Sequence, residues 1–138
     1  MKRNISIVDK YKSYAVEGAT SIDRNSIETI INDSIDNIFF FCLEYCNPET
    51  LNSDITVLLN KLRLDGSLIL QFMNTKKICE GLIAETISEE LFLKSFINKK
   101  QLISVDKICS LIGGDSFTII KLDHIESETV MIIKRISI

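Results

Sequence analysis

The sequence is poor in the residues that bind metal ions. Its 138 residues include a single histidine, His124, and four cysteines, no two of which have CxxC spacing: Cys42, Cys46, Cys79 and Cys109. A structural zinc ion needs about four nitrogen or sulfur ligands at suitable spacing, so we expect no metal site. Each cysteine lies in or beside an apolar segment, which is typical of small buried side chains rather than of redox or nucleophilic thiols.

Basic clusters, a leader and long apolar runs are also missing. The net charge is −3 and no basic stripe is visible, so the chain has no nucleic-acid footprint of its own, although a partner subunit could supply one. Lys2 and Arg3 are followed by an apolar patch that ends at Asp9, which does not make a signal peptide. No apolar run approaches the roughly 20 residues of a membrane span. We therefore predict a cytoplasmic protein with reduced thiols and no membrane contact.

The composition is that of a globular protein. Hydrophobic residues make up 46% of the chain and charged residues 25%. The length is that of one ordinary domain and is sufficient to bury a core. Because no internal repeat, low-complexity tract or linker is present, we predict one domain over residues 1–138.

The centre of the chain predicts one strand–helix–strand unit. Ile35–Leu43 and Ser67–Met73 are apolar on successive positions, as strands are when both faces of a parallel sheet are covered. Between them an apolar-periodic helix begins at Asn47, a residue that can cap it. Asp65 and Gly66 are expected to end the helix, with the glycine in the left-handed cap conformation.

The flanking segments complete an α/β domain. Before the centre we predict strands over Asn4–Asp9 and Tyr14–Ala19 and a helix over Asp23–Ile31. After it we predict helices over Thr75–Thr86, Ser88–Lys100 and Ser104–Ile112, then strands over Ser116–Leu122 and Thr129–Ile138. About six residues join the last two strands, too few for a parallel crossover, so they form an antiparallel hairpin. The expected fold is a mostly parallel sheet with helices on both faces and a C-terminal antiparallel β-hairpin.

Two of these helices are expected to bury apolar faces. The first would turn Ile78, Leu82 and Ile83 inward, and the second would form an apolar face from Leu91, Phe92, Phe96 and Ile97.

The order of elements resembles the C-terminal half of the class I S-adenosylmethionine (SAM)-dependent methyltransferases. The matching segments are Ile35-Asp36-Asn37-Ile38-Phe39-Phe40-Phe41, Leu62-Arg63-Leu64-Asp65-Gly66-Ser67-Leu68-Ile69-Leu70, and the hairpin of Phe117–Leu122 with Val130–Ile136. The resemblance implies a Rossmann-like sheet, and in that family SAM lies against a glycine-rich turn after the first strand. An acidic residue that ends the second strand binds the ribose of the cofactor. Only 34 residues precede Ile35 and they hold one glycine, Gly18, so the glycine-rich motif is missing. We therefore expect either an abbreviated first half or a relic or fragment of the fold.

The resemblance nominates four cofactor-binding residues. Asp9 and Gly18 are the candidates for the early acid and the remnant of the glycine turn. Glu44 and Asn74 follow the two central strands, at the sheet edge where ligands bind in open α/β folds. Each also has a structural explanation as a strand end, turn, cap or surface residue. We place His124 in the hairpin turn, at the surface.

Three functions are compatible with these observations. The first is a non-catalytic, methyltransferase-like module that acts through a protein partner or as a homo-oligomer and needs no cofactor. The second is a SAM-dependent methyltransferase with an abbreviated or shared cofactor site, since methyl transfer depends mainly on positioning and no catalytic residue is indicated. The third is an unrelated small α/β regulatory protein, because fold does not fix function. The sequence leaves open whether the protein is an enzyme.

Overall fold

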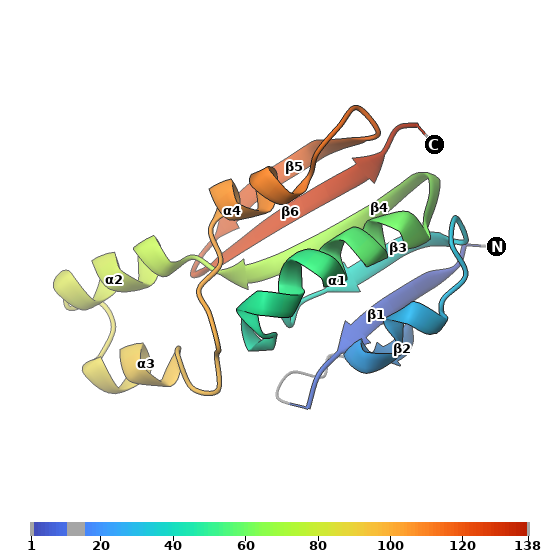
Figure 1. Ribbon diagram of the computed structural model, residues 1–138. Coiled ribbons are helices and arrows are strands. Elements are labelled where there is room, and N and C mark those ends of the chain that lie inside the picture. Colours follow the sequence, from blue (N-terminus) through green and yellow to red (C-terminus); the bar gives the residue numbers. More distant parts are fainter. Residues whose placement is uncertain (1, 11–15, 138) are drawn as a thin grey trace.

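A six-stranded sheet forms the centre of the protein (Figure 1). The computed structural model describes residues 2–10 and 16–137. The elements run in the order β1 (Asn4–Val8), β2 (Thr20–Asp23), η1 (Arg24–Thr29), β3 (Ile35–Phe40), η2 (Leu43–Tyr45), α1 (Pro48–Lys61), β4 (Leu62–Met73), α2 (Thr75–Ile83), α3 (Glu89–Lys94), α4 (Val105–Leu111), β5 (Phe117–Ile125) and β6 (Glu128–Arg135). The strand order is β2-β1-β3-β4-β6-β5. The first four strands are parallel, whereas β6 is antiparallel to β4 and to β5. The predicted α/β class and C-terminal antiparallel hairpin are confirmed.

Helix α1 begins as predicted but ends earlier. Pro48 occupies its first turn, and Leu51, Ile55 and Leu58 are fully buried on one face. Asn47 stands at the cap position without a side-chain capping bond. The helix ends at Lys61, because the chain passes directly into β4.

The turn residues Asp65 and Gly66 lie within β4, not at the helix end. Asp65, not the glycine, takes a left-handed conformation with φ of 64°. Gly66 is needed for another reason, since a Cβ there would lie 2.8 Å from the carbonyl oxygen of Ile35 on the neighbouring strand.

The early strands differ most from the prediction. Of the strand expected over Tyr14–Ala19, residues 14 and 15 lie outside the described residues, and residues 16–19 form a turn. The second strand is β2, which pairs in parallel with β1. The helix expected from Asp23 is the 3-10 helix η1, which Asp23 caps by accepting a hydrogen bond from the amide of Asn25 at 2.8 Å. Local pattern indicated these elements but not their pairing.

The C-terminal hairpin is tighter than predicted. Strands β5 and β6 extend to Ile125 and Glu128, so the turn is reduced to Glu126 and Ser127. His124 is exposed as expected but lies in β5, opposite Thr129.

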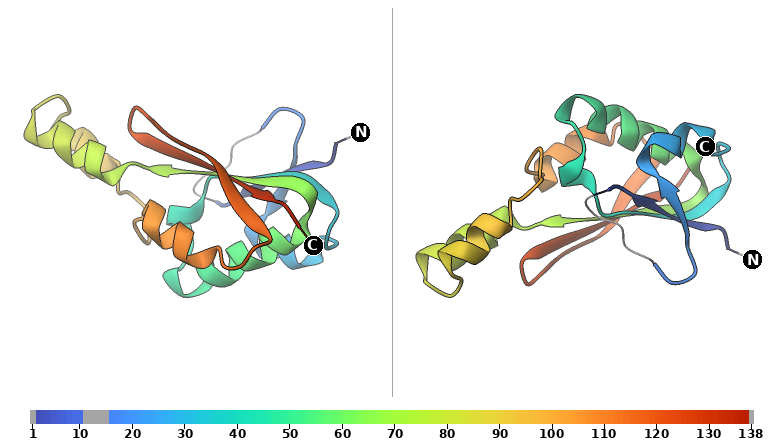
Figure 2. Two further views of the ribbon diagram at one scale, coloured as in Figure 1. Left: turned by 90° about the horizontal axis from the view of Figure 1, so that it is seen from above. Right: turned by 90° about the horizontal axis from the view of Figure 1, so that it is seen from below.

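The core lies on one face of the sheet. Helices α1 and α4 and the 3-10 helix η1 all lie on the same side (Figure 2). The strand side chains that point toward them are buried, among them Ile38, Leu70 and Ile133. No described helix covers the opposite face, which differs from the expected helices on both faces. The described helices that cover the sheet, η1 after β2, α1 after β3 and α4 before β5, all pass on the one side.

We call the side that no described helix covers the open face. It carries half-buried apolar side chains from three adjacent strands: Phe39, Phe41, Ile69, Val130 and Ile132. Phe39 pairs with Ile69 and Ile69 with Ile132, so these three form a row across the sheet. The rings of Phe39 and Phe41 meet edge to face with centroids 6.0 Å apart.

Helices α2 and α3 project beyond the end of the sheet (Figures 1 and 2). We call residues 74–100, which contain both helices and their ends, the arm. Ile78 is buried there as predicted, but the prediction for Ile83 is wrong, because 84% of its surface is exposed. Among the described helices, none is long and apolar enough to cross a membrane.

Candidate functional site

The sheet has a topological switch point between β1 and β3. From β1 the chain moves outward to β2 and then returns to add β3 on the other side. In open α/β sheets, ligands bind in the crevice beyond the carboxyl ends of two such strands. The residues that follow Val8 and Phe40 therefore define the candidate site.

An ionic network occupies the β1 side of this crevice. The Arg24 side chain lies 3.5 Å from a carboxylate oxygen of Asp9 and 3.4 Å from one of Asp54. It thereby joins the end of β1 to the start of η1 and the middle of α1. Burial raises the pKa of the Asp54 carboxyl, and the nearby guanidinium opposes that shift. Sequence analysis missed Arg24 and Asp54, because they meet only in the folded chain.

Buried cysteines fill the β3 side. The Cys42 thiol lies 3.8 Å from the Ile7 carbonyl, and the Cys46 thiol lies 3.3 Å from the Cys42 carbonyl. A side-chain hydrogen bond with Cys46, together with burial, raises the pKa of Cys42. These two are buried as predicted, whereas Cys109 is exposed and Cys79 only partly covered, contrary to expectation.

A polar pocket of about 340 Å³ adjoins the network. Its lining side chains are almost all charged: Asp9, Lys10, Asp23, Arg24, Asn25 and Lys100. Asp23 ends β2 and is exposed. It therefore occupies the position of the ribose-binding acid that the family resemblance describes, a position for which sequence analysis had nominated Asp9.

Glu44 and Asn74 come together at the end of β4. One oxygen of the buried Glu44 carboxylate accepts a hydrogen bond from the Met73 amide at 3.2 Å, and the other lies 3.1 Å from the Lys99 ammonium. Asn74 caps α2 by accepting a hydrogen bond from the Lys77 amide at 3.2 Å. These contacts fix the junction of sheet and arm.

Gly18 lies far from the other three predicted residues. It precedes β2, and the parallel register places it at the opposite end of the strand pair from Asp9. It has a φ of 79° and is exposed. The structure thus separates the early acid from the proposed glycine remnant.

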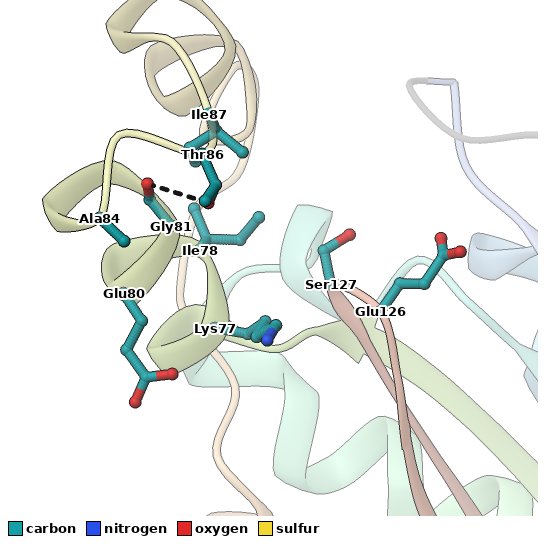
Figure 3. Close-up of a pocket in the computed structure, with 9 residues that line it drawn as sticks. All are labelled: Lys77, Ile78, Glu80, Gly81, Ala84, Thr86, Ile87, Glu126 and Ser127. Carbon is teal, nitrogen blue, oxygen red and sulfur yellow. Dashed lines mark hydrogen bonds between the residues drawn. The ribbon is translucent and has the colours of Figure 1, made fainter.

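A second pocket, of about 530 Å³, lies between α2 and the β5–β6 turn (Figure 3). Ile78, Ala84 and Ile87 form its apolar wall, while Lys77 and Ser127 lie nearer the sheet. The Thr86 hydroxyl donates to the Gly81 carbonyl at 3.2 Å and shapes one side. Nothing local in the sequence indicated this pocket, because its two sides are separated by roughly a third of the chain.

The crevice at the switch point does not fit the usual SAM cradle. The first residue after β1 is Asp9, whose carboxylate is 12% exposed and ion-paired. No glycine lies between it and Glu17 in the sequence, so this segment lacks the residue type that lets a backbone approach a ligand without a Cβ in the way. Within residues 2–10 and 16–137, no group of three or more His, Cys, Asp or Glu side chains is arranged to hold a metal ion.

Comparison with solved structures establishes the fold. A SAM-dependent methyltransferase from Archaeoglobus fulgidus superposes with a TM-score of 0.63 at 8% identity, covering 97% of this chain and 86% of that one. A Burkholderia thailandensis 1,6-didemethyltoxoflavin-N1-methyltransferase with bound S-adenosylhomocysteine gives 0.57 at 10% identity, covering 86% of this chain and 52% of that one. A SAM-dependent methyltransferase from Thermotoga maritima gives 0.55 at 14% identity, with 87% and 65% covered.

The chain therefore has a methyltransferase-like fold, as the sequence resemblance implied. It spans only part of the Burkholderia and Thermotoga proteins. At these identities the similarity shows the fold alone. No family model and no curated protein matches the sequence.

Proposed function

We propose that this protein is a non-catalytic, methyltransferase-like module that works by binding another protein. The observation that carries the proposal is the open face. Its row of Phe39, Ile69 and Ile132 is half-buried at the centre of a sheet that no described helix covers on that side. Contiguous apolar surface of this kind marks an interaction site.

The shape of the open face suits a helix of the partner. A sheet in this fold class is covered by helices on both sides, and here no described helix lies on one of the two sides. An amphipathic helix from the partner, with apolar residues at i, i+3, i+4 and i+7, would supply that missing layer.

The occupied crevice supports a non-catalytic role. The ion pairs of Arg24 with Asp9 and Asp54 fill one side, and the buried thiols of Cys42 and Cys46 fill the other. A cofactor would have to break these contacts in order to enter. Partly buried charges that lose their partners are costly.

Calorimetry with SAM and S-adenosylhomocysteine tests the absence of a cofactor. We expect heats at the dilution baseline for the chain alone and for its purified complex. Saturable binding that Asp9→Asn or Asp23→Asn weakens would overturn the proposal. Asp65→Asn is the matched control, because Asp65 lies at the opposite end of the sheet and Asn tolerates its left-handed backbone.

Footprinting tests the protein-binding part. The tagged chain would be isolated with its partner from the cells that make it and exposed to hydroxyl radicals, beside the chain alone. We expect protection of Phe39, Ile69 and Ile132, and loss of the complex when Ile69 and Ile132 are both changed to Lys. If the partner protected only other surfaces, and the open-face residues reacted with hydroxyl radicals as they do in the chain alone, the proposal would be contradicted.

One observation favours the second function. Asp23 ends β2 and faces a pocket of about 340 Å³ at the carboxyl ends of the strands, as the acid of a SAM-dependent methyltransferase would. The Archaeoglobus protein, which is described as a SAM-dependent methyltransferase, is a chain of similar length. The calorimetry above decides between the two functions.

A further inference from the structure

The arm exposes several large apolar side chains. Four of them are over half exposed: Ile83 at 84%, Leu91 at 56%, Leu93 at 61% and Ile97 at 58%. The two helices lie side by side and contact each other, while the rest of the fold leaves them projecting (Figures 1 and 2). Isolated exposed apolar residues are ordinary, but a cluster on a projecting element indicates an interface.

The arm is also divided by charge along its length. Residues 80–93, which form its outer part, contain Glu80, Glu85, Glu89 and Glu90 and no basic residue. The inner parts, residues 74–79 and 94–100, contain no acidic residue and have Lys76, Lys77, Lys94 and Lys100, besides Lys99, which is paired with the buried Glu44. The tip is therefore acidic and the base basic.

Helix dipoles do not account for this division. Acids are favoured at the amino-terminal end of a helix and bases at the carboxyl-terminal end. Helix α3 follows that rule with Glu89 and Lys94, but α2 reverses it, with Lys76 and Lys77 in its first turn and Glu80 toward its end. The ion pairs of Lys76 with Glu80 and of Lys94 with Glu90 are exposed and weak.

We propose that the arm is a self-association site that joins two copies of this chain. The two arms lie antiparallel about a two-fold axis, so that the acidic tip of each meets the basic base of the other. Each arm then buries its exposed Ile83, Leu93 and Ile97 against the same surface of the second copy, whereas Leu91, two residues before Leu93, lies on another side of α3. A two-fold interface requires one self-complementary patch, and a surface with opposite charges at its two ends satisfies that requirement.

This inference does not rest on the proposed function. The open face and the arm lie on different parts of the molecule, so a monomeric chain would leave the open-face proposal standing. Binding of SAM would overturn the proposed function and leave the arm interface unaffected.

Sedimentation equilibrium of the full chain tests the interface. We expect a mass of twice the 15.7 kDa chain at high concentration and weaker association at high salt. Ile83→Glu combined with Leu93→Glu should weaken dimerisation by about a hundredfold or more, since both lie at the apolar centre. Ile125→Glu, which is 56% exposed but on β5, is the control and should leave the dimer intact. Far-UV circular dichroism verifies folding, which exposed positions should preserve.

Charge reversal tests the antiparallel arrangement. Lys76→Glu with Lys77→Glu at the base, or Glu85→Lys with Glu89→Lys at the tip, should each weaken dimerisation by about tenfold. The variant with all four changes should recover most of the lost affinity, because the changed pair at the base of one copy then meets the changed pair at the tip of the other with the charges exchanged. Asp115→Lys with Asp123→Lys makes the same charge change away from the arm and should have no effect. A monomer at every concentration, or a dimer that ignores both the apolar and the charge changes, would overturn the inference.

Discussion

Asp36 connects the amino-terminal end of β3 to that of β1 through hydrogen bonds with the backbone of Arg3. One carboxylate oxygen accepts a hydrogen bond from the Arg3 amide at 2.7 Å, and the other lies 3.4 Å from the Arg63 guanidinium. The amide of Asp36 also donates to the Arg3 carbonyl at 2.8 Å. The hydrogen bond from the Arg3 amide, supported by the Arg63 charge, lowers the pKa of the Asp36 carboxyl.

The lowered pKa predicts a pH-dependent loss of stability for Asp36→Asn. The ionised form is favoured in the folded state, so its stabilisation is complete above the unfolded pKa of about 3.9 and is lost as pH falls through the folded value. We expect the variant to be less stable by about 1 kcal/mol at neutral pH. Urea unfolding should show the difference from wild type shrinking below about pH 4. Asp123 belongs to an exposed ion pair, so Asp123→Asn should lower the free energy of unfolding by less than about 0.5 kcal/mol at every pH. A stability difference between Asp36→Asn and wild type that grew as the pH fell would contradict the assigned role of Asp36.

At the scale of elements, the start of β4 depends on one glycine. The chain leaves α1 at Lys61 and must run beside β3 without a loop. A Cβ at Gly66 would lie 2.8 Å from the Ile35 carbonyl oxygen and 2.9 Å from that of Arg63, and both are backbone atoms that cannot move independently of their strands. The glycine therefore sets how closely β4 approaches β3.

Gly66→Ala is accordingly expected to destabilise the protein by about 2–3 kcal/mol. Gly113→Ala is a matched control, since no atom lies within 4 Å of its added Cβ and its φ is not in the left-handed region. The control should change stability by less than about 1 kcal/mol. The free energies of unfolding in urea provide the comparison. Equal effects at the two glycines would show that the β3–β4 approach is not limiting.

At the scale of the whole molecule, the sheet is packed on one side. The single core cluster contains residues from all three covering elements, η1, α1 and α4, and from the strand side chains beneath them. The open face has no such layer among the described residues. Two neighbouring residues of β6 lie on opposite faces of the sheet. Ile133 on the core side is fully buried, whereas Ile132 on the open face is only partly covered.

Substitutions of these neighbours should separate the two faces. Ile133→Ala removes side-chain atoms from the packed core and should cost about 3–4 kcal/mol. Ile132→Ala should cost about 1 kcal/mol in the isolated chain, because its side chain is only partly buried. Chemical denaturation of the chain without its partner measures both. A cost at Ile132 as large as that at Ile133 would mean that the open face is also a packed layer.

The sequence by itself determined the class of fold and most of the elements. Successive apolar positions identified β3 and β4, periodicity identified α1, and Ser88 and Ser104 marked the helices that they cap. The short final connection required an antiparallel hairpin. These features depend on residues within about one element of each other, so local pattern is enough to read them.

Only the tertiary structure decided the faces and the site. Arg24 meets Asp9 and Asp54, Gly18 lies at the opposite end of the sheet from Asp9, and all the helices that cover the sheet lie on one side. Ile83, Leu91 and Ile97 of the arm are exposed although their spacing predicted burial. Strand order, register and the direction in which a helix leaves the sheet set these outcomes, and each depends on contacts between segments far apart in the chain.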